Sequence, residues 1–289
     1  MTTPAQTTSA PTAPVPIPIR RMDFHFADDT PKYWFRGNPW ITHYLNAMSA
    51  VFPDGERFFI QSVRNLQPKI SAPQLQANIR SFIAQEAWHG KEHEAFNKQL
   101  EERHGVPMAS VTGFTKKYLL RAAKYLPQML QLAITIALEH FTAILANQLL
   151  KEPEAFESPG TAETAMFLWH AVEETEHKAV AFDVYRAVYG KGIGAYLVRV
   201  IVMLLVSIFF LGFISAFHLR FLWRDGELFN RQAFSGFFEF AFVSPGPMRK
   251  MIPDYLGYYR PAFHPWDHDN RALIAERVTA LAGKELRSA

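Results

Sequence analysis

Glutamate and histidine side chains recur along this chain at spacings that could hold metal ions. The order is a lone glutamate, a Glu-x-x-His pair, a second lone glutamate and a second Glu-x-x-His pair. The six residues are Glu56, Glu86, His89, Glu139, Glu174 and His177. Carboxylates and imidazoles without thiolates suit iron or manganese, and zinc as an alternative. We therefore expect a metal centre, and the elements that carry these residues must bring them together.

The spacing within each pair places both side chains on one face of a helix, because successive residues are rotated by about 100°. His93 lies seven residues after Glu86 and returns to within about 20° of it, so we add His93 to the ligand set. His170 shares the face of the second pair, and His140 adjoins the second lone glutamate. We expect His170 and His140 to support the ligands by hydrogen bonds. For His93 and His170, ligation and a hydrogen-bonding or core role remain alternatives.

A third Glu-x-x-His pair, Glu101 with His104, provides an internal comparison. It directly precedes Gly105, a typical residue at a helix C-terminus. Its side chains should therefore lie in solvent at a helix end. We expect only the two pairs inside long helical patterns to bind metal.

Composition excludes several classes of function. The 289 residues are 49% hydrophobic, which is ample for a core, and the net charge is +3 without long Lys/Arg runs, so nucleic-acid binding gets no support. The chain has no cysteine, which excludes disulfides, thiolate zinc sites and iron–sulfur clusters. Residues 1–19 are rich in Thr, Ala and Pro without an apolar stretch, so we predict a disordered leader and a cytoplasmic protein.

The fold class predicted is all-α, because helical stretches punctuated by proline and glycine recur and no strand-like alternation stands out. A four-helix bundle over 20–190 would carry the metal ligands. We expect Pro53 to interrupt the first helix, with Asp54 capping a segment whose first turn holds Glu56, and Pro127 to kink or break the third. The four predicted helices span roughly 40–66, 73–104, 112–150 and 159–189.

The remaining region, 191–289, is predicted to be an apolar and aromatic helical extension. Residues 200–217 carry no charge, which reaches the lower length limit for a membrane span. Insertion of this helix into the membrane, its association with the inner face of the membrane and its burial against the bundle are all open. A membrane interface, an apolar substrate tunnel or core packing would each explain the many aromatic residues of 221–266.

Four sequence blocks stand out around the candidate ligands and near the C-terminus. They begin at Val51, Gln85, Trp169 and Arg260 and read VFPDGERFF, QEAWHGKEH, WHAVEETEHK and RPAFHPWDHD. These blocks resemble those of a bacterial family of predicted metal-dependent hydrolases, with a likeness that covers roughly 17–285. The ligand order also resembles that of ferritin-like di-iron oxidases and oxygenases. The resemblance implies a metal-dependent enzyme with a ferritin-like bundle.

The sequence leaves three functions open. We prefer a di-iron enzyme that uses O₂ to oxidise a small apolar or lipid-like substrate, with apolar walls that exclude water. The alternatives are a hydrolase that uses a metal-bridged water and a non-catalytic metal-binding bundle. Two metal ions are expected, with iron preferred and manganese or zinc as alternatives. A homodimer is left open.

Overall fold

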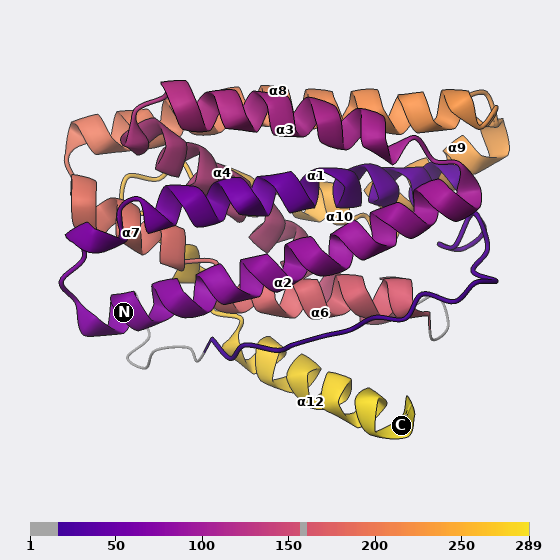
Figure 1. Cartoon of the computed structure of the whole chain (residues 1–289), viewed down its shortest axis with the longest axis horizontal. Coiled ribbons are helices and arrows are strands. Elements are labelled where there is room, and N and C mark those ends of the chain that lie inside the picture. Colours follow the sequence, from indigo (N-terminus) through magenta and orange to yellow (C-terminus); the bar gives the residue numbers. More distant parts are fainter. Residues whose placement is uncertain (1–16, 157–160, 289) are drawn as a thin grey trace, which may run out of the picture.

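The computed structural model describes residues 17–156 and 161–288, with side chains up to residue 279. Every regular element in these ranges is helical, which confirms the predicted all-α class. The predicted leader, 1–19, lies outside the described residues except for its last three. Residues 17–38 run along the bundle as an irregular segment (Figure 1).

Four long helices pack so that each contacts two of the others. The contacting pairs are α1 with α2, α2 with α6, α6 with α4 and α4 with α1 (Figure 1). A ring of four helices therefore encloses a common interior. The helices are α1 (Pro39–Arg64), α2 (Pro73–His104), α4 (Gln128–Lys151) and α6 (Ala162–His177).

Further helices cover this ring from outside. Helix α3 (Met108–Tyr125) packs on α1, α7 (Val180–Tyr189) packs on α2 and α4, and α8 (Ile193–Arg224) packs on α1 and α4. The remaining helical elements are α5 (Pro153–Phe156), α9 (Arg231–Phe238), α10 (Pro247–Lys250), α11 (Ile252–Gly257) and α12 (Arg271–Ser288), a π-turn at Glu239–Val243, and 3₁₀ turns at Gln67–Lys69 and Pro265–Asp267.

Local signals explain several helix ends. The side chain of Asn38 accepts hydrogen bonds from the first backbone N–H groups of α1, and proline follows it at the first helical position. Gly105 ends α2 in the left-handed conformation, at φ +64°, where glycine avoids the steric cost of a Cβ. The predicted bounds of α2 therefore agree with the structure. Pro127 separates α3 from α4 and makes the predicted third helix two helices.

Two expectations about the helices were wrong, whereas the break at Pro127 was predicted. Pro53 lies inside an uninterrupted α1, and Asp54 forms an ion pair with Arg57 at 2.9 Å instead of capping a new segment. Glu56 therefore projects from the middle of a long helix. The predicted helix at 159–189 is divided into α6 and α7 at Lys178 and Ala179.

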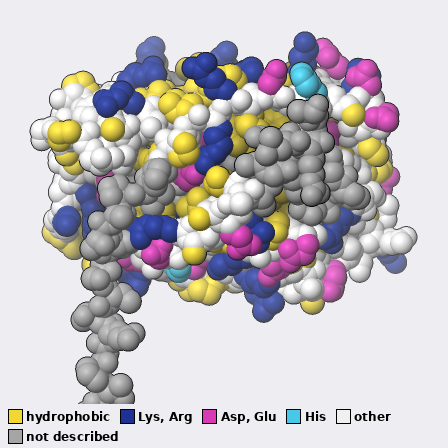
Figure 2. Space-filling view, turned by 90° about the horizontal axis from the view of Figure 1, so that it is seen from below, with side chains coloured by type: hydrophobic (Ala, Val, Ile, Leu, Met, Phe, Trp, Pro, Cys, Tyr) yellow, Lys and Arg dark blue, Asp and Glu magenta, His cyan; other side chains and the backbone are white. Residues whose placement is uncertain are grey.

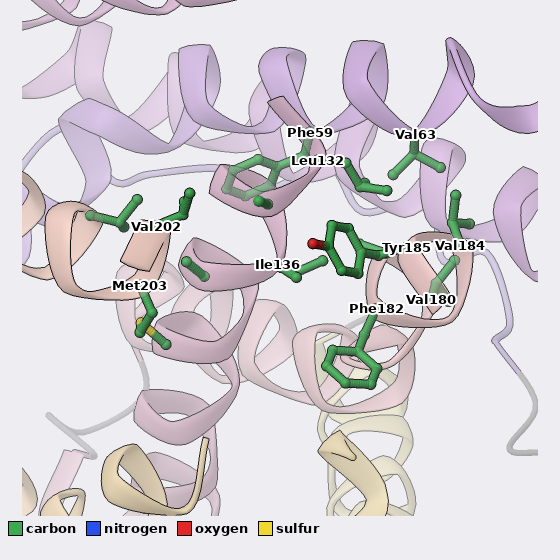
Figure 3. Close-up of a cluster of buried hydrophobic side chains, with 14 of the residues drawn as sticks. Phe59, Val63, Leu132, Ile136, Val180, Phe182, Val184, Tyr185, Val202 and Met203 are labelled. Carbon is green, nitrogen blue, oxygen red and sulfur yellow. The ribbon is translucent and has the colours of Figure 1, made fainter. Parts of the chain in front are cut away.

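A hydrophobic core joins α8 to the ring of helices. Figure 3 shows one cluster of buried hydrophobic side chains from four helices. The cluster contains Phe59 and Val63 of α1, Leu132 and Ile136 of α4, Val180, Phe182, Val184 and Tyr185 of α7, and Val202 and Met203 of α8. Full burial of an aliphatic side chain of this kind contributes about 1.5–3 kcal/mol. The inner face of α8 therefore belongs to the same core as α1, α4 and α7, and this core holds two of the site-bearing helices, α1 and α4, against each other.

Candidate metal centre

One end of the enclosed polar interior is formed by α2, α4 and α6. The Nε2 atom of His177 lies 2.9 Å from Glu86 Oε1, 3.6 Å from Glu139 Oε2 and 3.6 Å from Glu174 Oε1. All four side chains are buried. One imidazole nitrogen thus faces three carboxylates that come from three different helices.

The other end adds α1. His170 Nε2 lies 2.9 Å from Glu174 Oε1 and 4.0 Å from Glu56 Oε1, while His89 Nδ1 lies 3.7 Å from Glu174 Oε1. Three groups of side chains have potential ligand atoms within 4.8 Å of one another. They are Glu56, His89 and His170; Glu86, His89 and Glu174; and Glu86, Glu139 and His177. Glu86 belongs to the last two groups, so the two ends of the site are continuous.

Most of the inward donor atoms have no hydrogen-bond partner among the described residues. An unsatisfied polar group in a protein interior costs about 1–3 kcal/mol, and a charged one costs more. These atoms converge on one place, where cations would satisfy all of them together. The residues therefore fit metal ions. The atoms are both carboxylate oxygens of Glu56 and Glu139, Oε2 of Glu86 and Nδ1 of His89, whereas Oε1 of Glu86 and Nε2 of His177 face each other at 2.9 Å.

The electrostatics reflect this crowding of like charges. Burial, together with the charges of Glu86 and Glu174, raises the pKa of Glu56 well above its ordinary value. Burial likewise raises the pKa of Glu86 to about 7, although a hydrogen bond from His177 partly offsets it. Burial also acts to raise the pKa of Glu174, but the charges and hydrogen bonds of His177 and His170 outweigh it and hold this pKa well below the usual range. The metal-free cluster is therefore an electrostatically costly arrangement.

The outward nitrogen of each paired histidine has a hydrogen-bond partner. His177 Nδ1 lies 2.9 Å from the amide oxygen of Gln85, and His89 Nε2 lies 3.1 Å from Glu173 Oε2. Arg20, from the irregular N-terminal segment, forms an ion pair with Glu173 at 3.2 Å. These bonds fix the ring orientations, so that Nε2 of His177 and Nδ1 of His89 point to the carboxylates.

His93 and His170 have different places from those expected. His93 Nε2 lies 2.7 Å from His170 Nδ1, and His93 Nδ1 lies 2.8 Å from Ser49 Oγ. Both nitrogens of His93 are therefore used outside the carboxylate cluster. His170 instead supplies Nε2 to a group of potential ligand atoms with Glu56 and His89. The geometry favours His170 over His93 as the third imidazole ligand.

The hydrogen-bond chain behind His170 also determines which of its nitrogens carries the proton. Asn97 donates its amide to the backbone oxygen of Ser49 at 3.0 Å, so its Oδ1 must accept from Ser49 Oγ, 2.7 Å away. Ser49 Oγ then accepts from His93 Nδ1, and burial lowers the pKa of His93 well below the ordinary range, so the ring is neutral. His93 Nε2 must therefore accept from His170 Nδ1. His170 Nδ1 therefore carries a proton, which leaves Nε2 as the nitrogen that a metal ion could bind.

His140 and the comparison pair lie apart from the cluster. His140 Nε2 lies 3.2 Å from the backbone oxygen of Asp254, and its ring packs on Tyr258 and Phe263. Burial lowers the pKa of His140 to about 3, so it is a neutral core histidine. Glu101 is exposed and accepts from the backbone N–H of Ala109.

Two contacts of the site were not anticipated from the sequence. Thr142 donates its hydroxyl to Glu174, and Gln85 orients His177. Thr142 lies three residues after Glu139 on the same face of α4, so the spacing argument that found the ligands could have found it. Gln85 directly precedes a ligand, and its role depends on tertiary packing that spacing does not predict.

An apolar cavity of about 100 Å³ reaches the metal-binding cluster at His170 and Glu174. Its walls come from α1, α4, α6 and the segment from α9 to α10. Apolar walls with a few convergent polar groups are typical of small-molecule sites. The wall residues include Leu45, Met48, Phe52, Leu145, Leu149, Phe167, Phe237, Phe240 and Met248.

The fold and the site together define an all-helical protein with buried glutamate and histidine groups that could bind metal ions. The chain belongs to the family described as predicted metal-dependent hydrolase, which it matches over residues 18–269. This confirms the family resemblance inferred from the sequence blocks, and it favours the hydrolytic alternative over the oxidative one. No curated protein and no solved structure matched the chain.

Proposed function

We propose that this chain is an enzyme that binds two metal ions inside a ferritin-like bundle. Glu86, Glu139 and His177 would hold one ion, and Glu56, His89 and His170 the other, with Glu174 within reach of both. The convergence of unsatisfied buried oxygens and nitrogens carries the proposal. Four carboxylates would be balanced by two divalent ions, and the nearby Arg20 is already paired with Glu173 and Glu176.

Hydrolysis of a substrate with an apolar part is the first candidate for the reaction, because the family description names it. When bound, a pair of metal ions activates water for hydrolysis or, if the ions are redox-active, O₂ for oxidation. The chain's own contribution is positioning. The cavity walls orient the apolar part of the substrate and exclude water, while the hydroxyl of Thr142 holds Glu174 in place.

Oxidation of an apolar substrate with O₂ is the second candidate, and the donor set favours it. A lone glutamate and a Glu-x-x-His pair, each repeated on another helix, is the arrangement of di-iron and di-manganese carboxylate proteins. The walls beside Glu174 and His170 are almost entirely apolar, as an oxidation that must exclude water requires. Iron is the preferred metal for this reaction, with manganese or zinc for hydrolysis.

Metal analysis of the purified chain tests the binding site. We expect two ions per wild-type chain and the loss of both in Glu174→Ala, because this substitution removes a carboxylate within reach of both ends. Glu101→Ala and His104→Ala are matched controls from the third Glu-x-x-His pair and should keep both ions. Two ions retained in Glu174→Ala would refute the proposed site.

The reaction class is tested on the loaded protein. A hydrolase should cleave long-chain p-nitrophenyl esters without oxygen when loaded with manganese or zinc. An oxidase should consume O₂ after Fe(II) loading and reduction, and Glu174→Ala should abolish that consumption. A fully loaded protein that does neither would place the chain among non-catalytic metal-binding proteins.

A further inference from the structure

Helix α8 has a second apolar face that points away from the protein. Five large side chains follow a spacing of three and four residues and form one stripe along the helix. They are between 47% and 68% exposed, although none is polar. The stripe consists of Leu197, Ile201, Leu204, Ile208 and Leu211. A surface stripe of this length on one helix indicates a partner that is itself apolar.

The inner face of α8 is fastened to the rest of the chain along its length. Arg199 donates to the backbone oxygens of Tyr258 and Arg260, Ser207 lies 2.8 Å from the hydroxyl of Tyr255, and His218 Nε2 lies 2.9 Å from a backbone oxygen of α1. By length and composition both α4 and α8 could cross a membrane, but α4 is mostly buried. Because its polar contacts hold α8 against the protein, it is suited to lie flat on a membrane and not to cross it alone.

Helix α3 lies beside α8 and supplies positive charge. Phe114 of α3 packs on Phe213 of α8, with ring centroids 5.0 Å apart. The two helices together contain seven Lys or Arg residues and no Asp or Glu, and six of the seven are exposed. Since the whole chain has a net charge of +3, the residues outside α3 and α8 together carry a net charge of −4. The face in Figure 2, opposite α3 and α8, shows Asp and Glu mixed with Lys and Arg.

The same region adjoins the apolar cavity. Phe237 of α9 forms part of the cavity wall and packs on His218 of α8, with ring centroids 5.4 Å apart. Nearby, the rings of Phe238 and Phe242 pack on each other with centroids 5.3 Å apart, and both side chains are exposed, at 51% and 42%. Exposed aromatic side chains with nearby basic residues are typical of surfaces at a membrane interface.

We propose that α3, the outer face of α8 and the exposed phenylalanines of α9 and the adjoining π-turn dock onto an anionic lipid bilayer. The apolar stripe enters the headgroup region, and the basic residues of α3 bind anionic headgroups. The cavity beside α9 then lies close to the bilayer, so the substrate is an apolar molecule dissolved in it. This last step rests on the function proposed above, whereas the docking does not.

Vesicle binding of the purified full-length chain tests the docking. We expect co-sedimentation with vesicles of phosphatidylcholine and phosphatidylglycerol (70:30) that weakens as salt is raised. Ile201→Gln/Ile208→Gln should reduce binding at least tenfold, because two exposed apolar side chains lose the burial that the membrane provides. Lys116→Gln/Lys117→Gln should reduce binding to anionic vesicles roughly tenfold and leave binding to pure phosphatidylcholine unchanged.

Ile19→Gln is a matched control, because Ile19 is 50% exposed and Ile201 is 53% exposed. Ile19 lies on the other side of the ring of helices from α8, since its neighbour in the sequence, Arg20, forms an ion pair with Glu176 of α6. Its substitution should leave vesicle binding unchanged. Absence of wild-type binding, or a dimer in solution that dissociates in Ile201→Gln/Ile208→Gln, would overturn the docking. Metal content measured on the same samples separates this failure from failure of the metal site.

Discussion

Replacing Glu86 by glutamine should stabilise the metal-free protein while it weakens metal binding. Burial raises the pKa of Glu86 from an ordinary 4.5 to about 7. A tenfold change in proton affinity corresponds to about 1.4 kcal/mol, so an ionised Glu86 costs the folded state about 3 kcal/mol. Glutamine has nearly the same shape without the charge, but it forms a weaker hydrogen bond with His177. We therefore expect a net gain of about 1–3 kcal/mol in the free energy of unfolding at pH 7.5.

The pH dependence identifies the cause of this gain. The pKa of Glu86 in the folded protein lies above the ordinary 4.5, so Glu86 lowers the stability of the wild type progressively as pH rises from 4.5 to 7. Glutamine does not ionise, so the variant does not lose this stability. The advantage of Glu86→Gln should therefore be about 2 kcal/mol smaller at pH 5.5 than at pH 7.5. Urea unfolding of chelator-treated protein at both pH values measures it. The exposed Glu101→Gln should show no such pH dependence.

Metal reverses the order of stability in the same experiment. Wild-type protein gains stability from ions that bind only the folded state, whereas Glu86→Gln has lost the charged carboxylate from both donor groups that contain residue 86. With saturating Mn²⁺ or Fe²⁺ the wild type should be the more stable protein. A metal-free Glu86→Gln that is less stable than the wild type at pH 7.5, or a difference independent of pH, would refute the electrostatic account of the cluster.

Three further substitutions test the parts of the site. His170→Ala should remove an ion that His93→Ala retains, because only His170 presents a nitrogen to Glu56 and His89; equal metal contents in the two variants would contradict this. Asn97→Leu should weaken binding of that ion roughly tenfold, since Ser49 would be free to donate to His93 and reverse the proton order of the chain; an unchanged affinity would refute the tautomer argument. Gly90→Ala should stabilise α2 by about 1 kcal/mol yet weaken metal binding, because the Cβ of the alanine would lie 3.1 Å from Glu56 Oε2. As a control, the Cβ in Gly113→Ala on α3 would meet nothing within 4 Å, so this substitution should leave metal binding intact.

Spacing along the chain was sufficient to predict which residues meet, because each long helix repeats its faces every three to four residues. The glutamates and the two Glu-x-x-His histidines all lie in the buried cluster. Spacing could not distinguish His93 from His170, since both lie on the inward faces of their helices. Their roles depend on Ser49 and Asn97, which direct His93 away from the carboxylates.

Helix ends were less predictable than helix faces. Pro53 was expected to break α1, but a proline within a long helix is tolerated where packing holds both sides, and α1 packs on α2, α3, α4 and α8. The break between α6 and α7 carries no proline or glycine. There Lys178 reaches the backbone oxygen of His268 and the side chain of Asn270, contacts about 90 residues away that no local pattern predicts.

The cavity reaches the cluster at the end that contains His170, which makes the two ends of the site unequal. Its walls include Glu174 and His170, together with Thr142, but none of Glu86, Glu139 or His177. The end formed by these last three adjoins Phe82, whose ring packs on His177 with centroids 4.9 Å apart. A substrate in the cavity therefore meets the end that contains His170 first. Substitutions at His170 should affect both substrate selection and metal content, whereas those at Glu139 should act through the metal alone.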